Sequence, residues 1–270
     1  MQPNQPGISL IAKKITAPIT VGGNIHKQSW QSAAWSNRLV DMVTGAPGLY
    51  DTRTAVLWND THLYAVFWAE EPFLEAHQIE RDSLIFLEND LELFIDGGGC
   101  YYELEINARN TVYEVFFIWR DAYQKGGRFQ VPEFDVHQPE AVTFGGDYDR
   151  TGASLWRGTH PRSLRWAFLN YDMPGLETAV QLNRTLNDHT GIDRGWSLEI
   201  GIPRESLHWL ADGRKLPPTD GDVWRMFLGR FQKLVVSGQE VQPHPAMVSD
   251  AHGIYDTHQP ERWSRVLFQE

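Results

Sequence analysis

Apolar and polar residues alternate with a period of two along most of the chain. The alternating runs are rich in Val, Ile, Phe, Tyr and Trp, and Gly, Asn, Asp and Pro separate them. They include TAVLWND, HLYAVFWAEE, DLELFID, YYELEINA, TVYEVFFIW, GWSLEIGIP, DVWRMFLGRF and WSRVLFQE. Short runs of this kind with this punctuation are typical of antiparallel sheets packed face to face. The pattern predicts an all-β protein, an antiparallel β-sandwich of the jelly-roll kind.

Helical signals are few, and one segment departs from the strand pattern. We expect short helical turns only within residues 24–35 and after Pro203, a residue suited to a first helical turn. Residues 121–174 are rich in Gly, Pro, Arg and Asp and are too long for an ordinary connection, so they predict an irregular insertion that is either an inserted subelement or a functional loop. Nothing else in the sequence separates two parts, so we predict that residues 1–270 form a single domain.

The segment from Glu88 to Trp119 predicts two successive hairpins. A two-residue turn at Gly98 and Gly99 places Glu92 opposite Glu105. A second two-residue turn, at Arg109 and Asn110, would place Glu105 opposite Glu114. One sheet face would then carry the row Glu92, Glu105 and Glu114, with Asp90, Asn107, Phe94 and Glu103 beside it. The other face would be the core face, with Leu91, Leu93, Ile95, Tyr102, Leu104, Ile106 and Tyr113.

A row of carboxylates on adjacent strands needs something to offset the repulsion between like charges. Three explanations remain open at this point. The carboxylates could face solvent, could pair with Arg109, Arg120 or Arg230, or could bind a ligand. Such a ligand would be a set of sugar hydroxyls or a cation such as calcium, which prefers oxygen ligands.

Overall composition excludes several classes of function. The formal net charge of −11 argues against nucleic acid as a partner, because nucleic-acid affinity comes largely from Lys and Arg. Cys100 is the single cysteine, so the chain has no internal disulfide and no companion thiol for zinc. The N-terminal residues lack the apolar stretch of a secretion signal, and no stretch is long enough to span a membrane. As written, the sequence predicts a cytoplasmic protein without a membrane partner, or an extracellular one if a leader has been removed.

Several motifs together resemble a known family. TRTAVLWNDTHLYAVFWAEEP, RDSLIFLENDLELFID, YYELEINARNTVYE, DRGWSLEIGIP, GDVWRMFLGRF and THQPERWSRVLF are similar, in this order, to successive strands of the family 9 carbohydrate-binding modules and their stand-alone relatives. The resemblance runs from about Val21 to Phe268. It implies an antiparallel β-sandwich that binds sugars, in some members at chain ends, often with structural calcium. It also implies that Glu92, in the acidic strand DLELFID, contacts sugar hydroxyls.

The sequence departs from the family where its two sugar-stacking tryptophans are expected. Phe86 and Leu87 stand at the first position, and the segment 255–258 stands at the second. A sugar site could therefore stack on Phe86 or Tyr255, or use Trp119, Trp156 or Trp166 from in and around the irregular segment. His258 precedes Pro260 and leads into the last strand, so two interpretations stay open: His258 lies at the rim of the concave face, or Pro260 and Glu261 simply end a loop.

The leading hypothesis is a non-catalytic protein that recognises an oligo- or polysaccharide and takes part in carbohydrate catabolism. The candidate binding residues are Glu92, Glu105, Asn107, Phe86, Trp119, Arg230, Tyr255 and His258. A first alternative is a glycoside hydrolase that uses Glu92 with Glu105, since hydrolysis of a glycosidic bond needs two carboxyl groups. A second alternative is a haem-binding sandwich, although no His and Met stand at positions that suggest axial ligands.

Overall fold

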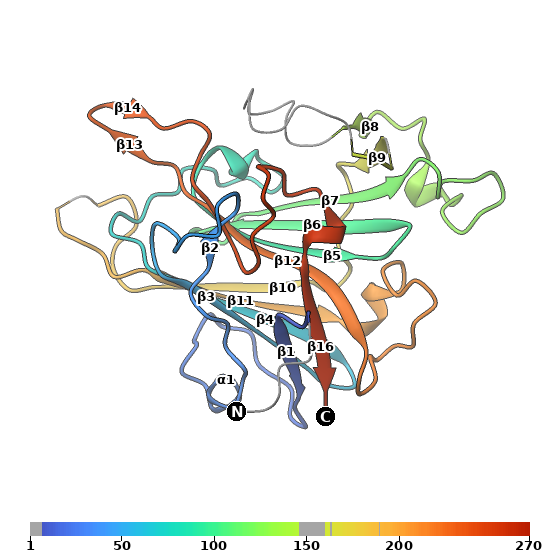
Figure 1. Cartoon of the computed structure of the whole chain (residues 1–270), viewed down its shortest axis with the longest axis horizontal. Coiled ribbons are helices and arrows are strands. Elements are labelled where there is room, and N and C mark those ends of the chain that lie inside the picture. The colour runs from blue at the N-terminus through green and yellow to red at the C-terminus, as the bar shows by residue number, and fades with distance from the viewer. Residues whose placement is uncertain (1–6, 146–159, 163, 189) are drawn as a thin grey trace.

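The computed structural model describes residues 7–145, 160–162, 164–188 and 190–270, and nearly all of its regular structure is β (Figure 1). The helices are a short α-helix, α1 (Gln28–Gln31), and the 3₁₀ turns η1 (Ile85–Leu87), η2 (Pro132–Phe134), η3 (Arg204–Leu207) and η4 (Pro260–Arg262). In the part of the chain that is described, no helix has the length and apolar character needed to cross a membrane. The all-β prediction is confirmed.

The main strands follow one another in a single hydrogen-bonded order. The order begins with β10 (Glu177–Leu182), β11 (Trp196–Pro203), β4 (His62–Ala69) and β3 (Thr52–Trp58), and continues with β1 (Leu10–Lys14) and β16 (Ser264–Gln269). It ends with β12 (Val223–Phe231), β5 (Asp90–Asp96), β6 (Cys100–Asn107), β7 (Val112–Trp119), β9 (Arg165–Phe168) and β8 (Ala141–Phe144). Beside β12 lie β15 (Ala246–Val248) and β2 (Val40–Asp41), and β13 (Val235–Val236) pairs with β14 (Gln239–Glu240) as a separate ribbon.

This sheet folds back on itself as a sandwich. Phe67 and Leu198, from the β10–β3 part, belong to the same buried apolar cluster as Leu93 and Leu104, from the β12–β8 part. Pairing is antiparallel except at β1, which runs parallel to both β16 and β3. The five aliphatic side chains expected on the core face are each at most 1% exposed, as predicted: Leu91, Leu93, Ile95, Leu104 and Ile106.

The opposite face of β5, β6, β7 and β12, which we call the outer face, is also buried over much of its area. Phe94, Tyr101, Phe117 and Phe227 form a second apolar cluster there. The chain between β15 and β16 contributes Trp263 to the same cluster. The aromatic cluster and the chain between β15 and β16 therefore shield polar side chains of the outer face from solvent.

The first predicted hairpin is confirmed. Glu92 pairs with Glu105 and Phe94 with Glu103, and Gly97 N donates to the Cys100 carbonyl (2.8 Å) across the turn. Gly98 has a φ of 66°, which L residues with a side chain rarely adopt. The two-residue turn that the Gly pair predicts is the one that forms.

The second predicted hairpin is wrong by one residue. Glu105 pairs with Tyr113, and Glu114 pairs with Leu104. The loop holds three residues, 108–110, because Asn110 adopts a φ of 65° and Asn107 N bonds to the Thr111 carbonyl (3.3 Å). This is the longer hairpin loop in which a residue with positive φ follows a turn. Since side chains alternate between faces, the slip moves Glu114 to the core face and Tyr113 to the outer face.

The insertion at residues 121–174 is less irregular than expected. It contains η2, β8 and β9, and β9 extends the main sheet by pairing with β7. Trp166 lies in β9, whereas Trp156 lies outside the described residues. That the whole chain forms one domain stays a prediction.

Candidate sugar-binding pocket on the outer face

A cavity of about 490 Å³ opens on the outer face beside β5 and β6. We call it the carboxylate pocket. It brings together four of the candidate residues, Phe86, Glu92, Glu105 and Tyr255. The remaining lining residues are Leu84, Leu87, Phe231, Gln242, His244 and Thr257. The volume lies within the range of about 300–1,000 Å³ that is usual for small-molecule sites.

Three kinds of element build this pocket. Glu92 and Glu105 project from facing positions of β5 and β6, which the Gly98 turn fixes in register. Phe86 comes from η1, which directly precedes β5. Phe231 ends β12, the other neighbour of β5. The floor is therefore rigid sheet, and loops supply the remaining walls.

The two glutamates at the floor are buried beside a third carboxylate. Glu92 is 3% exposed, Glu105 2% and Asp90 0%. One oxygen of each lies within 4.8 Å of one oxygen of the others. Asp90 Oδ1 also accepts a hydrogen bond from the Phe231 amide (3.2 Å), which ties β5 to the end of β12. The explanation of an exposed, solvated acidic face is excluded for these residues.

This carboxylate group fits the oxygen chemistry of a hard cation. Calcium binds oxygens at about 2.3–2.6 Å, so oxygens on opposite sides of one ion lie about 5 Å apart. The spacing of the Asp90, Glu92 and Glu105 oxygens is compatible with that geometry. Two of these carboxylates also line the carboxylate pocket, so a cation held here would be next to any ligand in the pocket.

Aromatic rings form the apolar walls. Phe86 packs edge-on against Tyr113, with ring centroids 5.7 Å apart. Tyr255 packs edge-on against Phe231 at 6.0 Å. The Tyr255 hydroxyl donates to the His244 carbonyl (2.8 Å), so the two loops that carry these residues are joined. Flat apolar rings beside carboxylates offer both surfaces that a sugar needs, because sugars have apolar C–H faces and hydroxyl edges.

The rim of the pocket carries a small polar cluster. His244 Nε2 lies 2.8 Å from Glu240 Oε1, and Gln242 Nε2 bonds to the same oxygen (2.5 Å). The hydrogen bond from His244, and next that from Gln242, lower the pKa of the Glu240 carboxyl. Glu240 is therefore ionised at neutral pH and holds His244 and Gln242 in place at the rim.

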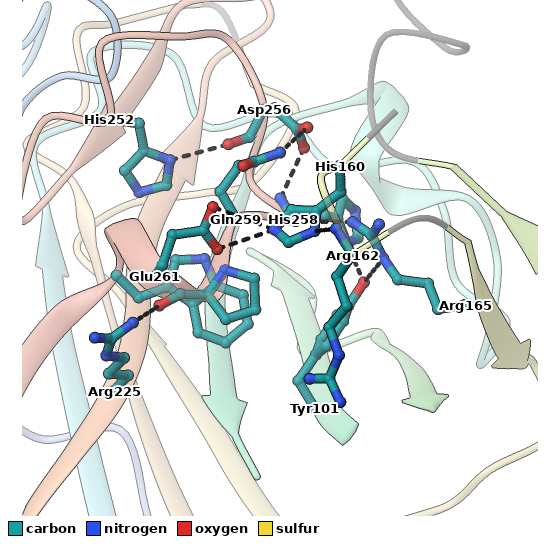
Figure 2. Close-up of polar contacts among 12 residues, drawn as sticks. Tyr101, His160, Arg162, Arg165, Arg225, His252, Asp256, His258, Gln259 and Glu261 are labelled. Carbon is teal, nitrogen blue, oxygen red and sulfur yellow. Dashed lines mark hydrogen bonds and ion pairs between the residues drawn. The ribbon is translucent and has the colours of Figure 1, made fainter. Parts of the chain in front are cut away.

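The loop that carries Tyr255 and Thr257 is held by its own hydrogen bonds, several of which Figure 2 shows. Asp256 accepts from the His258 amide (2.9 Å) and from Gln259 Nε2 (2.8 Å). His252 Nδ1 lies 2.9 Å from the Asp256 carbonyl, and Trp263 Nε1 donates to the Thr257 carbonyl (2.6 Å). This wall of the pocket is thus preorganised, which reduces the entropy lost when a ligand binds.

A buried relay of hydrogen bonds links the same loop to strands β6 and β9 (Figure 2). Arg165 Nε donates to the Tyr101 hydroxyl (2.6 Å), and this hydroxyl lies 2.9 Å from His258 Nδ1. The Tyr101 hydroxyl accepts from Arg165, so we assign its own proton to the hydrogen bond with His258 Nδ1. The proton of the His258 ring is then on Nε2, which lies 3.5 Å from Glu103 Oε2. Burial raises the pKa of Tyr101 well above its ordinary value, so the hydroxyl keeps that proton.

Four candidate residues lie outside the pocket lining. His258 is in the buried relay, and Trp119 is 2% exposed with the Arg165 guanidinium 4.5 Å from its ring centroid. Asn107 caps the β6–β7 loop, because its Oδ1 accepts from the Arg109 and Thr111 amides. Arg230 forms a buried ion pair with Glu71 (2.5 Å). These contacts stabilise the scaffold around the pocket.

The arginines considered as partners of the acidic row have other contacts. Burial lowers the pKa of Arg230 and raises that of its partner Glu71. Arg109 Nε donates to the Ala76 carbonyl (2.8 Å), and the Arg120 guanidinium lies over Trp166. Glu114, on the core face, pairs with Arg81 and accepts from Met173 N (2.9 Å) and the Tyr102 hydroxyl (2.5 Å).

Sequence reasoning missed the residues that loops bring in. His244 and Gln242 belong to the SGQEVQPHP stretch, which has no strand periodicity. Phe231 could have been found, since it has the same parity as Phe227 and Gly229 in β12 and so shares their face. Leu84 and Leu87 are about half exposed (49% and 53%), an unusual position for leucine that only the structure shows.

Comparisons with known proteins place the fold. No family profile matches the chain, and none of the curated proteins matches it significantly. Among solved structures, a proposed carbohydrate-binding protein from Bacteroides uniformis superposes with a TM-score of 0.58 at 12% identity, covering 96% of this chain and 98% of that one. A family 9 carbohydrate-binding module from Caldicellulosiruptor kristjanssonii, solved with cellotriose, gives 0.51 at 12% identity, covering 96% and 93%. The same kind of module solved with glucose gives 0.51 at 11% identity, covering 96% and 94%.

These likenesses define the class of fold, a β-sandwich of the kind found in carbohydrate-binding modules. More particularly, the chain has the fold of the family 9 modules over 96% of its length. The resemblance seen in the sequence is confirmed at the level of fold.

Proposed function

We propose that this protein binds carbohydrate in the carboxylate pocket. The observation that carries the proposal is the cavity itself, which combines aromatic walls at Phe86 and Tyr255 with the carboxylates of Glu92 and Glu105. Support comes from the fold, because family 9 modules with this fold were solved with glucose and with cellotriose. We further propose that the ligand is an oligo- or polysaccharide bound by its chain end, and that the protein serves carbohydrate catabolism.

The residues would divide the work of recognition. Phe86 and Tyr255 would stack against the apolar C–H face of a sugar ring, which favours a flat ring over a flexible chain. Glu92 would accept hydrogen bonds from sugar hydroxyls. A carboxylate accepts through both oxygens and makes stronger bonds than a neutral acceptor, so the pair at the floor would set orientation.

The test is calorimetric titration with a panel of mono- and oligosaccharides, including glucose and cellotriose. Glu92→Gln keeps the side-chain volume and removes the charge, so binding should weaken by about 1–3 kcal/mol, the usual size of a hydrogen bond to a charged group. Glu205→Gln is the matched control, because the Glu205 side chain is 88% exposed and Glu205 is not one of the residues that line the pocket. Heat from none of the sugars would refute the proposal.

We also propose that Asp90, Glu92 and Glu105 hold a cation such as calcium. The spacing of their oxygens and their burial support this. A bound cation would offset the repulsion between the facing glutamates. The chain's own part would be to supply carboxylate oxygens from β5 and β6, whose register fixes their separation.

The hydrolase alternative shares the same glutamates. An assay for new reducing ends, run on the sugars that bind, separates it from simple binding. Turnover that Glu92→Gln abolishes would make the protein a glycosidase, since such enzymes need both carboxyl groups of a pair. Binding without turnover supports the proposed function.

A further inference from the structure

A second cavity lies directly beside the carboxylate pocket. Its volume is about 460 Å³, and Leu87 lines both cavities. The second cavity is otherwise lined by Glu75, His77, Gln78, Glu88, Asn89, Lys233 and Val235. Each cavity exceeds the lower end of the size range for small-molecule sites, so each can hold a ligand group of its own.

Two chain segments and one ion cluster connect the cavities. One segment is Leu87–Asn89, which starts at the shared Leu87 and continues along the second cavity. The other follows β12, where Phe231 lines the first cavity and Lys233 lines the second. Lys233 N donates to Asn89 Oδ1 (2.7 Å), which joins these two segments. Glu240 lies 3.4 Å from Lys233 Nζ through one oxygen and 2.8 Å from His244 Nε2 through the other. One carboxylate thus touches a wall residue of each cavity.

The chemistry of the second cavity differs from that of the first. Its walls offer two carboxylates, two amides, an imidazole and an ammonium group, and its apolar side chains are Leu87 and Val235. Hydroxyl groups can donate to the carboxylates and accept from the ammonium and amide groups. A chain of sugars has hydroxyl groups for the polar walls of the second cavity and apolar C–H faces for the aromatic walls of the first, so it suits both cavities.

The backbone around Gln78 is fixed before any ligand arrives. Its amide lies 3.3 Å from Glu88 Oε1, and its carbonyl accepts from Asn107 Nδ2 (2.9 Å) and Thr111 Oγ1 (2.8 Å). Glu88 also accepts from the His77 amide (2.9 Å). These bonds use backbone atoms of Gln78, so its side chain can be replaced without breaking them.

We infer that the second cavity is a further sugar subsite, and that the ligand is an oligosaccharide that crosses Leu87 from the carboxylate pocket toward Lys233. The inference rests on the proposed function, since the first ring occupies the carboxylate pocket. Leu87 is 53% exposed and stands where the ligand would bend from one subsite to the next, offering an apolar contact between them. Hydrogen bonds in the second subsite then make affinity depend on chain length.

The test is titration of the whole chain with glucose and cellotriose. In the wild type, cellotriose should bind at least about tenfold more tightly than glucose. Gln78→Ala should weaken cellotriose binding by about three- to tenfold, the effect of losing one neutral hydrogen bond, and should leave glucose binding within about twofold. Lys233→Met should act in the same direction. Gln124→Ala is the matched control, because Gln124 is exposed and its side-chain amide donates to the nearby Asp121 carbonyl (3.2 Å).

The outcomes distinguish this inference from the proposed function. Equal affinity for both sugars in the wild type, or equal losses for both sugars in Gln78→Ala, would overturn the second subsite and leave the carboxylate pocket as a binding site. A melting temperature of Gln78→Ala equal to that of the wild type ensures that any loss reflects a ligand contact. Failure of every sugar in the panel to bind the wild type would overturn both.

Discussion

The two hairpins that join β5, β6 and β7 differ by one loop residue. The β5–β6 turn has two residues and is fixed by Gly98, whereas the β6–β7 loop has three and is fixed by Asn110 at positive φ. Both hairpins have glutamates in their strands, several residues away from the turn. The first keeps Glu92 and Glu105 together on the outer face, and the second sends Glu114 to the core face.

The two faces then use their carboxylates in different ways. Glu114 meets an arginine, a tyrosine hydroxyl and a backbone amide, all from the protein. Glu92 and Glu105 face each other and line a cavity. A carboxylate whose contacts come from several separate segments holds those segments together. A carboxylate that lines a cavity can also be reached by a ligand, and this is the role proposed for Glu92 and Glu105.

Replacing Glu114 should have the largest effect on stability. Glu114→Ala leaves the buried Tyr102 hydroxyl and Met173 amide without this acceptor and removes one of the two acidic partners of Arg81, so the free energy of unfolding should fall by about 3 kcal/mol. Chemical denaturation measures this. Glu205→Ala, at an exposed position, should change stability by less than about 0.5 kcal/mol.

Glu105→Gln, on the outer face, provides the comparison in stability with Glu114→Ala, on the core face. Removing one of two opposed charges should shift stability by less than about 1 kcal/mol, while sugar binding falls. A loss of stability for Glu105→Gln as large as that for Glu114→Ala would mean that the two faces do not differ in the way proposed.

Calcium should act on the outer face alone. Free calcium at ten times its dissociation constant should stabilise the wild type by about 1.4 kcal/mol, because it binds only the folded state, and a chelator should reverse the gain. Glu105→Gln should lose this response, whereas the destabilised Glu114→Ala should keep it. Thermal melts with calcium and with chelator provide the measurement. A melting temperature of the wild type that changes with neither calcium nor chelator would refute a cation at this site.

Much of the fold could be predicted from the sequence because strand alternation and the Gly98 turn are local signals. The face of Glu92, Glu105 and the core leucines followed from them. The face of Glu114 did not, because Asn107, Arg109 and Asn110 are compatible with a loop of two or three residues. What selects three residues is the positive φ of Asn110 together with its contact to Thr178, a residue distant in sequence.

The same limit applies to the candidate site. Glu92 and Phe86 were found through strands that resemble those of a known family. Gln242 and His244 were not, since their place depends on how the segment after β14 folds over β12. Arg230 and Trp119 are candidate sugar-binding residues in the sequence, yet the Glu71 ion pair and the outer-face cluster bury them. Pairing across distant segments is not visible in local periodicity.

A smaller effect than that of Glu114 should come from Asn110, which adopts positive φ in the loop of the second hairpin. Asn110→Ala forces a side chain without a local hydrogen bond into positive φ and removes the bond to the Thr178 carbonyl (3.2 Å), so stability should fall by about 1 kcal/mol. Asn110→Gly keeps the backbone freedom and loses only that bond, so it should cost about half as much. Denaturation of both variants checks the difference. If Gly costs as much as Ala, the bond to Thr178 sets the loop, and the three-residue turn is a consequence of packing against β10 instead of a local preference of Asn110.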